Sequence, residues 1–184
     1  MGLFNGFRVA AKTGTMAAGL GAAAPIYSAR WGSTTKYARV SGFSLSMMSL
    51  GTGFAAGSGL FELFKVTGFT VEDTDGAAVD LADKAGALQT RLATSAFSDM
   101  RIATTATLTA GTRDDVPDYP LASVEFGITT AVNTVHLPTT RIWLPDDDPL
   151  TLQQDEGLVL QATVPATGTW RAIVTPIWSE WEPY

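Results

Sequence analysis

From Lys36 onward, apolar and polar residues alternate along the chain with a period of two. The clearest run is KYARVSGFSLSMMSL, residues 36–50, in which the odd-numbered positions from Tyr37 to Met47 share one face. Successive side chains point to opposite sides of a β-strand, so this alternation predicts strands. Similar runs, rich in Thr and β-branched residues, predict further strands at LFELFKVTGFTV, ALQTRLA, MRIATTATLT, SVEFGITT, TRIWL, GLVLQATV and TWRAIVTPIW.

Turn residues separate these runs. Asp75-Gly76 is a turn signal, Gly68 marks a bend or bulge, and Pro117 with Pro120 makes TRDDVPDYP a loop. Eight or nine strands between turns predict an all-β fold with less than about 15% helix. We expect an antiparallel two-sheet sandwich, jelly-roll-like, with an immunoglobulin-like sandwich or a closed barrel as the alternatives.

The last predicted strand is apolar on both faces. In GLVLQATVPATGTWRAIVTPIWSEW, residues 157–181, the even positions from Trp170 onward form one apolar face, but Ile173, Ile177 and Trp181 lie on the other. One explanation is a bulge at Pro176 that turns Ile177 and Trp181 inward. The other is an edge strand, favoured by the missing N–H of Pro176 and covered by another subunit or by the N-terminal segment. We expect this strand to contribute a subunit contact through Ile173, Ile177 and Trp181, as well as core residues.

Residues 1–35 differ from the rest of the chain. They are rich in Ala and Gly, and they lack the periodic apolar face that a segment needs to fold alone. We therefore predict an extended N-terminal arm over residues 1–35 and a β-sandwich domain over residues 36–184. The arm is expected to cross onto a neighbouring subunit or a capsid protein, with its spaced aromatic residues as anchors: Phe4, Phe7, Tyr27 and Trp31.

Charge is unevenly distributed along the sequence. Residues 1–61 hold five basic and no acidic residues, a charge of +5, whereas residues 62–184 hold seven basic and 18 acidic residues, a charge of −11. This asymmetry favours contact between the arm of one copy and the body of another, or an acidic neighbour, with Arg8, Lys12 and Arg30 guiding the contact. The acidic body lacks the clustered Lys and Arg that phosphate contacts require, so nucleic acid is not an expected partner.

Residue types that carry catalysis are scarce. The chain has no cysteine and one histidine, His136. It has no G-x-S-x-G motif, so it lacks the kind of serine that this histidine could activate as a general base. Asp146, Asp147 and Asp148 could offer oxygen ligands to calcium, but consecutive side chains diverge and the spacing of an EF-hand is absent. No run reaches the ~18 apolar residues of a membrane helix. We expect a non-enzymatic protein with no catalytic or metal site, no cofactor and no membrane partner.

Three segments of the sequence, taken in their order along the chain, form a pattern that can be compared with known families. They are the early strand KYARVSGFSLSM, the Thr- and Ala-rich RIATTATLTAGT, and LPDDDPLTLQQDEGLVLQATVPATGTW, in which an acidic turn precedes a strand opened by Glu-Gly. This order resembles the head decoration, or cement, proteins and accessory structural proteins of tailed bacteriophages, which have jelly-roll folds. The resemblance implies a structural protein on the capsid surface of a virion. Its implied partners are the major capsid protein and further copies of itself, as a homotrimer.

A carbohydrate-binding β-sandwich module, associated with a tail or fibre, is the alternative function. Such a module would stack Trp and Tyr side chains on sugar rings, and a sandwich fold alone does not decide between the two functions. The position of the late Trp residues separates them: a shallow groove beside carboxylates favours the sugar, and a protein contact favours assembly.

Overall fold

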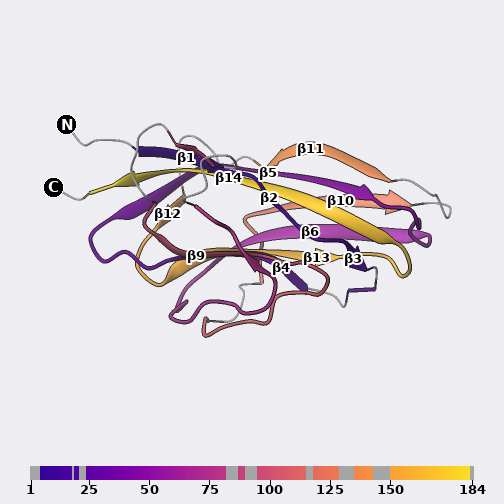
Figure 1. The fold of residues 1–184 in the computed structure, drawn as a ribbon, viewed down its shortest axis with the longest axis horizontal. Helices are drawn as coiled ribbons and strands as arrows, with labels where there is room; N and C mark the ends of the chain where they lie inside the picture. Colours follow the sequence, from indigo (N-terminus) through magenta and orange to yellow (C-terminus); the bar gives the residue numbers. More distant parts are fainter. Residues whose placement is uncertain are drawn as a thin grey trace.

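Two antiparallel β-sheets pack face to face and form the protein (Figure 1). The computed structural model describes residues 5–17, 19–20, 24–81, 87–89, 95–114, 118–128, 135–142 and 150–182, and it has no helix in these ranges. This architecture confirms the predicted β-sandwich. The strands in chain order are β1 Asn5–Val9, β2 Ala11–Lys12, β3 Met16–Ala17, β4 Ala24–Trp31, β5 Tyr37–Ser49, β6 Gly57–Val66, β7 Ala77–Ala78, β8 Ala87–Gln89, β9 Phe97–Ile102, β10 Ala122–Ile128, β11 His136–Ile142, β12 Leu150–Leu152, β13 Glu156–Thr163 and β14 Thr169–Trp181.

Strands that are adjacent in sequence often lie in different sheets. The first sheet, which we call sheet A, has the order β11-β5-β14-β1-β8, with β12 also paired to β5 and with β2 and β3 paired to β14. The second, sheet B, has the order β10-β6-β13-β4-β9-β7. The chain therefore changes sheets between β4 and β5, between β5 and β6, and between β13 and β14. The turn at Thr167 and Gly168, both with positive φ, carries the chain from sheet B to sheet A rather than closing a hairpin.

Local turn signals in the sequence are confirmed where the structure describes them. Asp75 and Gly76 both have a φ of 63°, and Gly68, directly beyond β6, has a φ of 60°. Backbone in this left-handed region is most accessible to Gly and Asp or Asn, so these residues allow the chain to reverse.

The hydrophobic core lies between the two sheets. Trp170 of β14 is fully buried and meets the ring of Phe61 from sheet B edge-on, with centroids 5.8 Å apart. Trp178 lies between Phe7 at 5.3 Å and Phe97 at 5.1 Å. These aromatic contacts join strands from both ends of the chain across the interior.

A bulge explains how β14 pairs with β5 along its whole length. The register shifts where Ile177 lies opposite Gly42 and Trp178 lies opposite Val40, so the extra residue is Ser41 on β5. β14 therefore keeps its alternation, and its even-numbered residues stay buried from end to end. On β5 the buried positions change from even to odd numbers at this bulge.

The explanation by an inward turn at Pro176 is wrong. The edge-strand explanation is wrong about an edge position, although the N-terminal segment does pair with β14, as one of its alternatives expected. No inward turn of Ile177 and Trp181 occurs in β14, because the bulge is on the partner strand. β14 is also not an edge strand, since β5 flanks it on one side and β1, β2 and β3 on the other. The register places Val9 opposite Pro176 and Ala10 opposite Thr175, between the end of β1 and the start of β2. The missing N–H of Pro176 is accommodated at this interruption.

The predicted boundary between an arm and a body at residue 35 is also wrong. β4 lies inside sheet B between β13 and β9, and β1 lies beside β14 in sheet A of the same chain. The segment lacks visible periodicity because a register shift on β4 falls between Tyr27 and Pro25, and Ile26 and Tyr27 are both buried. Residues 5–31, where described, are therefore part of the sandwich.

Deleting residues 1–30 should therefore unfold the protein. The deletion removes most of β4, so β13 loses a central partner, and it removes Ile26 and Tyr27, which are completely buried. Each large buried side chain contributes about 1.5–3 kcal/mol, against a total stability of about 5–15 kcal/mol. Thermal unfolding followed by circular dichroism, and the dispersion of chemical shifts in an NMR spectrum, measure the result. A truncated chain that unfolds cooperatively and gives dispersed NMR signals would contradict this topology and support the predicted separate arm.

Candidate functional site

The outer face of sheet A, on the side away from the core, carries exposed apolar side chains. It is formed by the odd-numbered residues of β14 and their neighbours on β1, β2, β5, β11 and β12. Four large apolar side chains on this face are exposed: Met48 by 48%, Ile173 by 40%, Tyr37 by 39% and Trp181 by 37%. Ile177 is half-buried over Gly42 in the same layer. Sheet faces of soluble domains are usually polar where they meet water, so this face has the composition of a contact surface.

Five basic residues share that face. Arg8 lies opposite Ile177, Lys12 opposite Ile173, and Arg171 opposite Met48. Arg39 and Arg141 lie on the same side, on β5 and β11. In the described strands of sheet A no Asp or Glu side chain lies on this face, because Glu180 points inward and is buried. The face is therefore positively charged on a chain whose net charge is −6.

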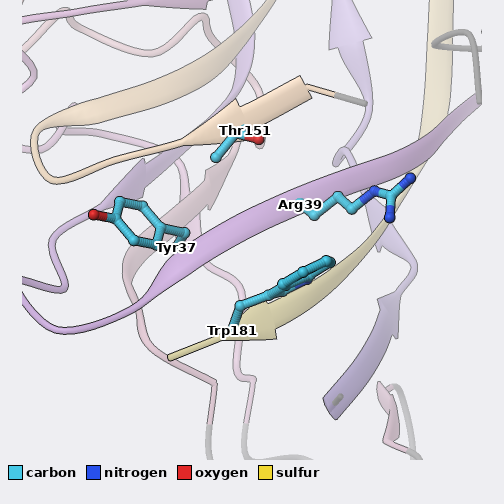
Figure 2. Close-up of a pocket in the computed structure, with 4 residues that line it drawn as sticks. All are labelled: Tyr37, Arg39, Thr151 and Trp181. Atoms are coloured by element: carbon cyan, nitrogen blue, oxygen red, sulfur yellow. The ribbon is translucent and has the colours of Figure 1, made fainter. Parts of the chain in front are cut away.

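A groove opens at one end of the face. Tyr37, Arg39, Thr151 and Trp181 line it, from three adjacent strands, and its volume is about 270 Å³ (Figure 2). The guanidinium carbon of Arg39 lies 5.8 Å from the centre of the Trp181 ring, and the Trp181 indole donates a hydrogen bond of 3.1 Å to Ser179. These contacts hold the indole and the guanidinium in fixed positions on the sheet.

The groove can receive an anion beside an apolar group. Arg39 has no carboxylate partner among the described residues, and its buried Nε has no hydrogen-bond acceptor. A guanidinium offers five donors, binds carboxylates in a two-point geometry and can also stack on an aromatic ring. The aromatic walls supply apolar contact next to that charge.

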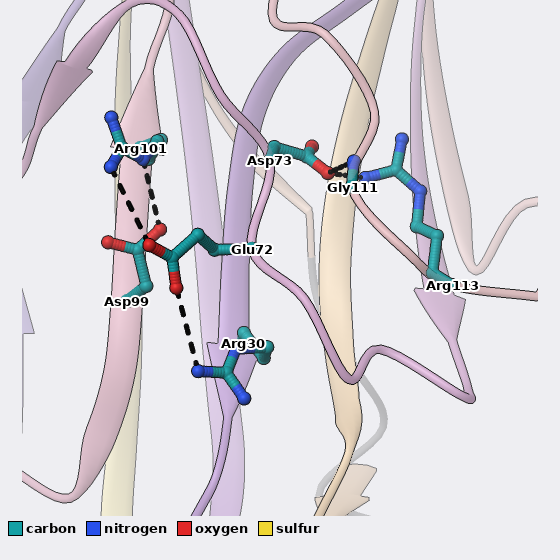
Figure 3. Close-up of polar contacts among 7 residues, drawn as sticks. All are labelled: Arg30, Glu72, Asp73, Asp99, Arg101, Gly111 and Arg113. Atoms are coloured by element: carbon teal, nitrogen blue, oxygen red, sulfur yellow. Dashed lines mark hydrogen bonds and ion pairs between the residues drawn. The ribbon is translucent and has the colours of Figure 1, made fainter.

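The opposite side of the sandwich has a different charge pattern. On the outer face of sheet B, Glu62 of β6 and Glu125 of β10 lie on neighbouring strands. Arg30, predicted to guide an arm, also lies on this side, where its Nη2 is 3.7 Å from Glu72 (Figure 3). Arg101 joins the same cluster, 3.9 Å from Glu72. Arg30 is therefore neutralised within the chain.

Asp99 belongs to this ion cluster through Arg101. Its carboxylate accepts a hydrogen bond of 3.2 Å from Nε of Arg101. Burial raises the pKa of Asp99 above its ordinary value, and the positive charge of Arg101 opposes that shift. The cluster joins β4, β9 and the loop that follows β6.

A second polar contact fixes the loops outside sheet B. Asp73 is completely buried, and it accepts hydrogen bonds from the backbone N–H of Gly111, at 2.9 Å, and from Arg113 (Figure 3). The guanidinium of Arg113 also lies 5.4 Å from the ring centre of Phe69. Both hydrogen bonds go to Oδ1 of Asp73, whereas its buried Oδ2 has no described hydrogen-bond partner. The contacts with Gly111 and Arg113 explain how these loops are held together.

A buried carboxylate at the end of the core was not predicted. Glu180 is 2% exposed and accepts hydrogen bonds from Ser95, from the N–H of Ala96 and from the indole of Trp178. It thereby ties the chain before β9 to β14. The sequence does contain a signal for this buried carboxylate, because Glu180 occupies an even position of β14, where the other residues face the core.

The structure does not bring the predicted contact residues to one place, and Arg30 lies on the sheet B side. Arg8, Lys12, Ile173, Ile177 and Trp181 come together on the outer face of sheet A. Phe7, Tyr27 and Trp31 instead lie in the core, with exposed fractions of 4%, 0% and 0%, so their prediction as anchors on another subunit is wrong. Phe4 and Asp146–Asp148 lie outside the described residues. Tyr37, Arg39 and Thr151 were missed, because only strand pairing brings them beside Trp181.

The late Trp residues do not form a row of exposed platforms. Trp170 and Trp178 are in the core. Of the two carboxylates that flank Trp181 in sequence, Glu180 is buried and Glu182 pairs with Lys36 at 3.7 Å. Arg39 lies over the ring of Trp181, which leaves less of that ring for stacking on a sugar.

Two comparisons with known proteins gave no match. No protein-family model matches it, and no curated protein matches its sequence. Within the described residues no helix is long and apolar enough to cross a membrane, and no three His, Asp or Glu side chains are grouped to hold a metal ion. His136 is exposed on β11, at the edge of sheet A.

Replacing Tyr27 with Phe should alter stability chiefly at alkaline pH. Burial raises the pKa of Tyr27, so above about pH 10 the unfolded chain loses this proton while the folded chain keeps it. Stability then falls by about 1.4 kcal/mol per pH unit, a loss that Tyr27→Phe removes. At pH 8 we expect a change within about 1 kcal/mol, because the hydroxyl bonds only to the Met100 sulfur at 3.5 Å. Urea midpoints at pH 8 and pH 11 measure both effects. Equal alkaline losses in the two proteins would place Tyr27 outside the core.

Proposed function

We propose that the chain is a non-enzymatic structural protein of a virion, attached to the capsid surface through the outer face of sheet A. The observation that carries this proposal is the composition of that face. Exposed Ile173 and Trp181 lie among basic side chains on a sheet whose other side is the core. The capsid as partner and the virion as location are supported by the resemblance to decoration proteins in the order of sequence segments.

The chemistry of the face favours an acidic protein partner. Its basic residues would speed and orient the encounter with the partner. The exposed apolar side chains, which become buried on binding, would supply most of the affinity. Half-buried Arg171 donates a hydrogen bond of 3.1 Å to Thr15, so its position is already set before a partner binds. A preorganised surface loses less conformational entropy on binding.

Further copies of the chain are the second proposed partner, in a homotrimer. The two outer faces lie on opposite sides of the sandwich, so contact between sheet A of one copy and sheet B of the next would stack copies in an open series. A closed trimer is better served by the lateral edges of the sandwich. That arrangement would leave the outer face of sheet A free for the capsid.

Replacing Ile173 with Asp should weaken attachment to capsids at least about tenfold, or about 1.4 kcal/mol. The change replaces an apolar contact with a carboxylate that binding must desolvate, and it offsets the positive charge of Lys12 opposite. Ile173 is 40% exposed, so the melting temperature should change little. Val71→Asp is the matched control, because Val71 is 51% exposed in a loop beyond β6 that belongs to the sheet B side. Cosedimentation with capsids measures the binding.

Two results would contradict the proposed surface. One is equal attachment of the Ile173→Asp variant and the unmodified protein. The other is loss of attachment in Val71→Asp alone. Attachment that a soluble sugar abolishes would favour the carbohydrate-binding alternative instead.

A further inference from the structure

We propose that the groove formed by Tyr37, Arg39, Thr151 and Trp181 binds a carboxylate side chain, Asp or Glu, that a protein partner presents beside an apolar residue. The inference rests on the proposed function. It names the chemistry of one point on the outer face of sheet A, which we call the docking face. It makes Arg39 the receptor for the carboxylate and the two aromatic rings the contact for the neighbouring apolar group.

Arg39 carries the first step of this inference. Its only described contact through the guanidinium is with the Trp181 ring, and its Nε is buried without an acceptor. A charged donor in a mainly apolar groove is destabilised until an anion pairs with it. Other arginines of the chain, such as Arg30 and Arg113, already have carboxylate partners. The buried Nε atoms of Arg30 and Arg171 also lack an acceptor, but Arg30 pairs with Glu72 and Arg171 donates a hydrogen bond to Thr15. Arg39 differs from both, because its guanidinium has neither kind of partner among the described residues.

The walls of the groove indicate what surrounds the carboxylate. Tyr37 and Trp181 lie directly opposite each other on β5 and β14, and both remain more than a third exposed. Thr151, opposite Arg39 on β12, adds a hydroxyl at the far wall. A space of about 270 Å³ accommodates one or two side chains rather than a long ligand.

A protein partner fits this groove better than a sugar acid. Trp, Tyr and Arg are the residues most enriched at the energetic centres of protein interfaces, and all three meet here. The groove is also continuous with the apolar and basic face of sheet A, since Ile177 and Ser179 precede Trp181 on the same side of β14. An isolated sugar site would not require that extended face.

NMR titration with short peptides tests the inference. The probes are acetyl-Ala-Leu-Glu-Leu-Ala-amide and its counterpart with Gln in place of Glu, added to the full chain into the millimolar range. The Trp181 indole signal is assigned by its loss in Trp181→Phe. We expect a saturable shift of this signal, with the Glu peptide binding about tenfold more tightly because its hydrogen bonds to Arg39 are charge-assisted.

Two variants complete the experiment. Arg39→Gln should abolish the preference for Glu, whereas Arg171→Gln, the same change elsewhere on the face, should keep it. Unchanged indole signals of Trp170 and Trp178, both in the core, show that the variants are folded.

Three results would overturn the inference. They are equal binding of the two peptides, a Trp181 shift with D-glucuronic acid but with neither peptide, and no shift with any probe. Capsid attachment is measured separately with Ile173→Asp, so a failure of the groove leaves the docking face standing. If Arg39→Gln leaves the preference for Glu unchanged and Ile173→Asp leaves capsid attachment unchanged, the docking face is refuted as well.

Discussion

The pairing of β14 with β5 is the constraint on which the rest of the structure depends. Two 13-residue strands from opposite ends of the chain run antiparallel over their whole length, and together they form the middle of sheet A. The bulge at Ser41 lies on β5, so β14 keeps one face in the core from Trp170 to Glu180. Its other face must then carry Ile173, Ile177 and Trp181 outward. The apolar outer surface is a consequence of this register and not of a local irregularity in β14.

The sequence predicted those parts of the fold in which alternation is unbroken. β5, β13 and β14 were recognised because their apolar positions repeat every second residue. β4 was not recognised, since a register shift buries Ile26 and Tyr27 in succession and hides the alternation in an Ala-rich segment. The predicted strand MRIATTATLT was too long, because β9 ends at Ile102. Propensity alone does not mark where a strand loses its partner.

The candidate site was predicted only in part, for a related reason. Ile173, Ile177 and Trp181 stand out in the sequence because they break a one-sided pattern. Tyr37 and Arg39 do not, since their position beside Trp181 depends on the pairing of strands far apart in the chain. The uneven charge of the sequence has a spatial counterpart that the sequence could not supply. Basic side chains gather on the outer face of sheet A, and carboxylates lie on the outer face of sheet B.

The central claim, that the outer face of sheet A is the docking surface, is most directly tested by hydroxyl-radical footprinting of the protein alone and bound to capsids. Met48 and Trp181 report on that face, and Tyr119, which is 85% exposed in the loop before β10, reports on a site away from it. The account predicts that binding lowers the oxidation rates of Met48 and Trp181 and leaves that of Tyr119 unchanged. Protection of Tyr119 with no protection of Met48 or Trp181 would contradict it.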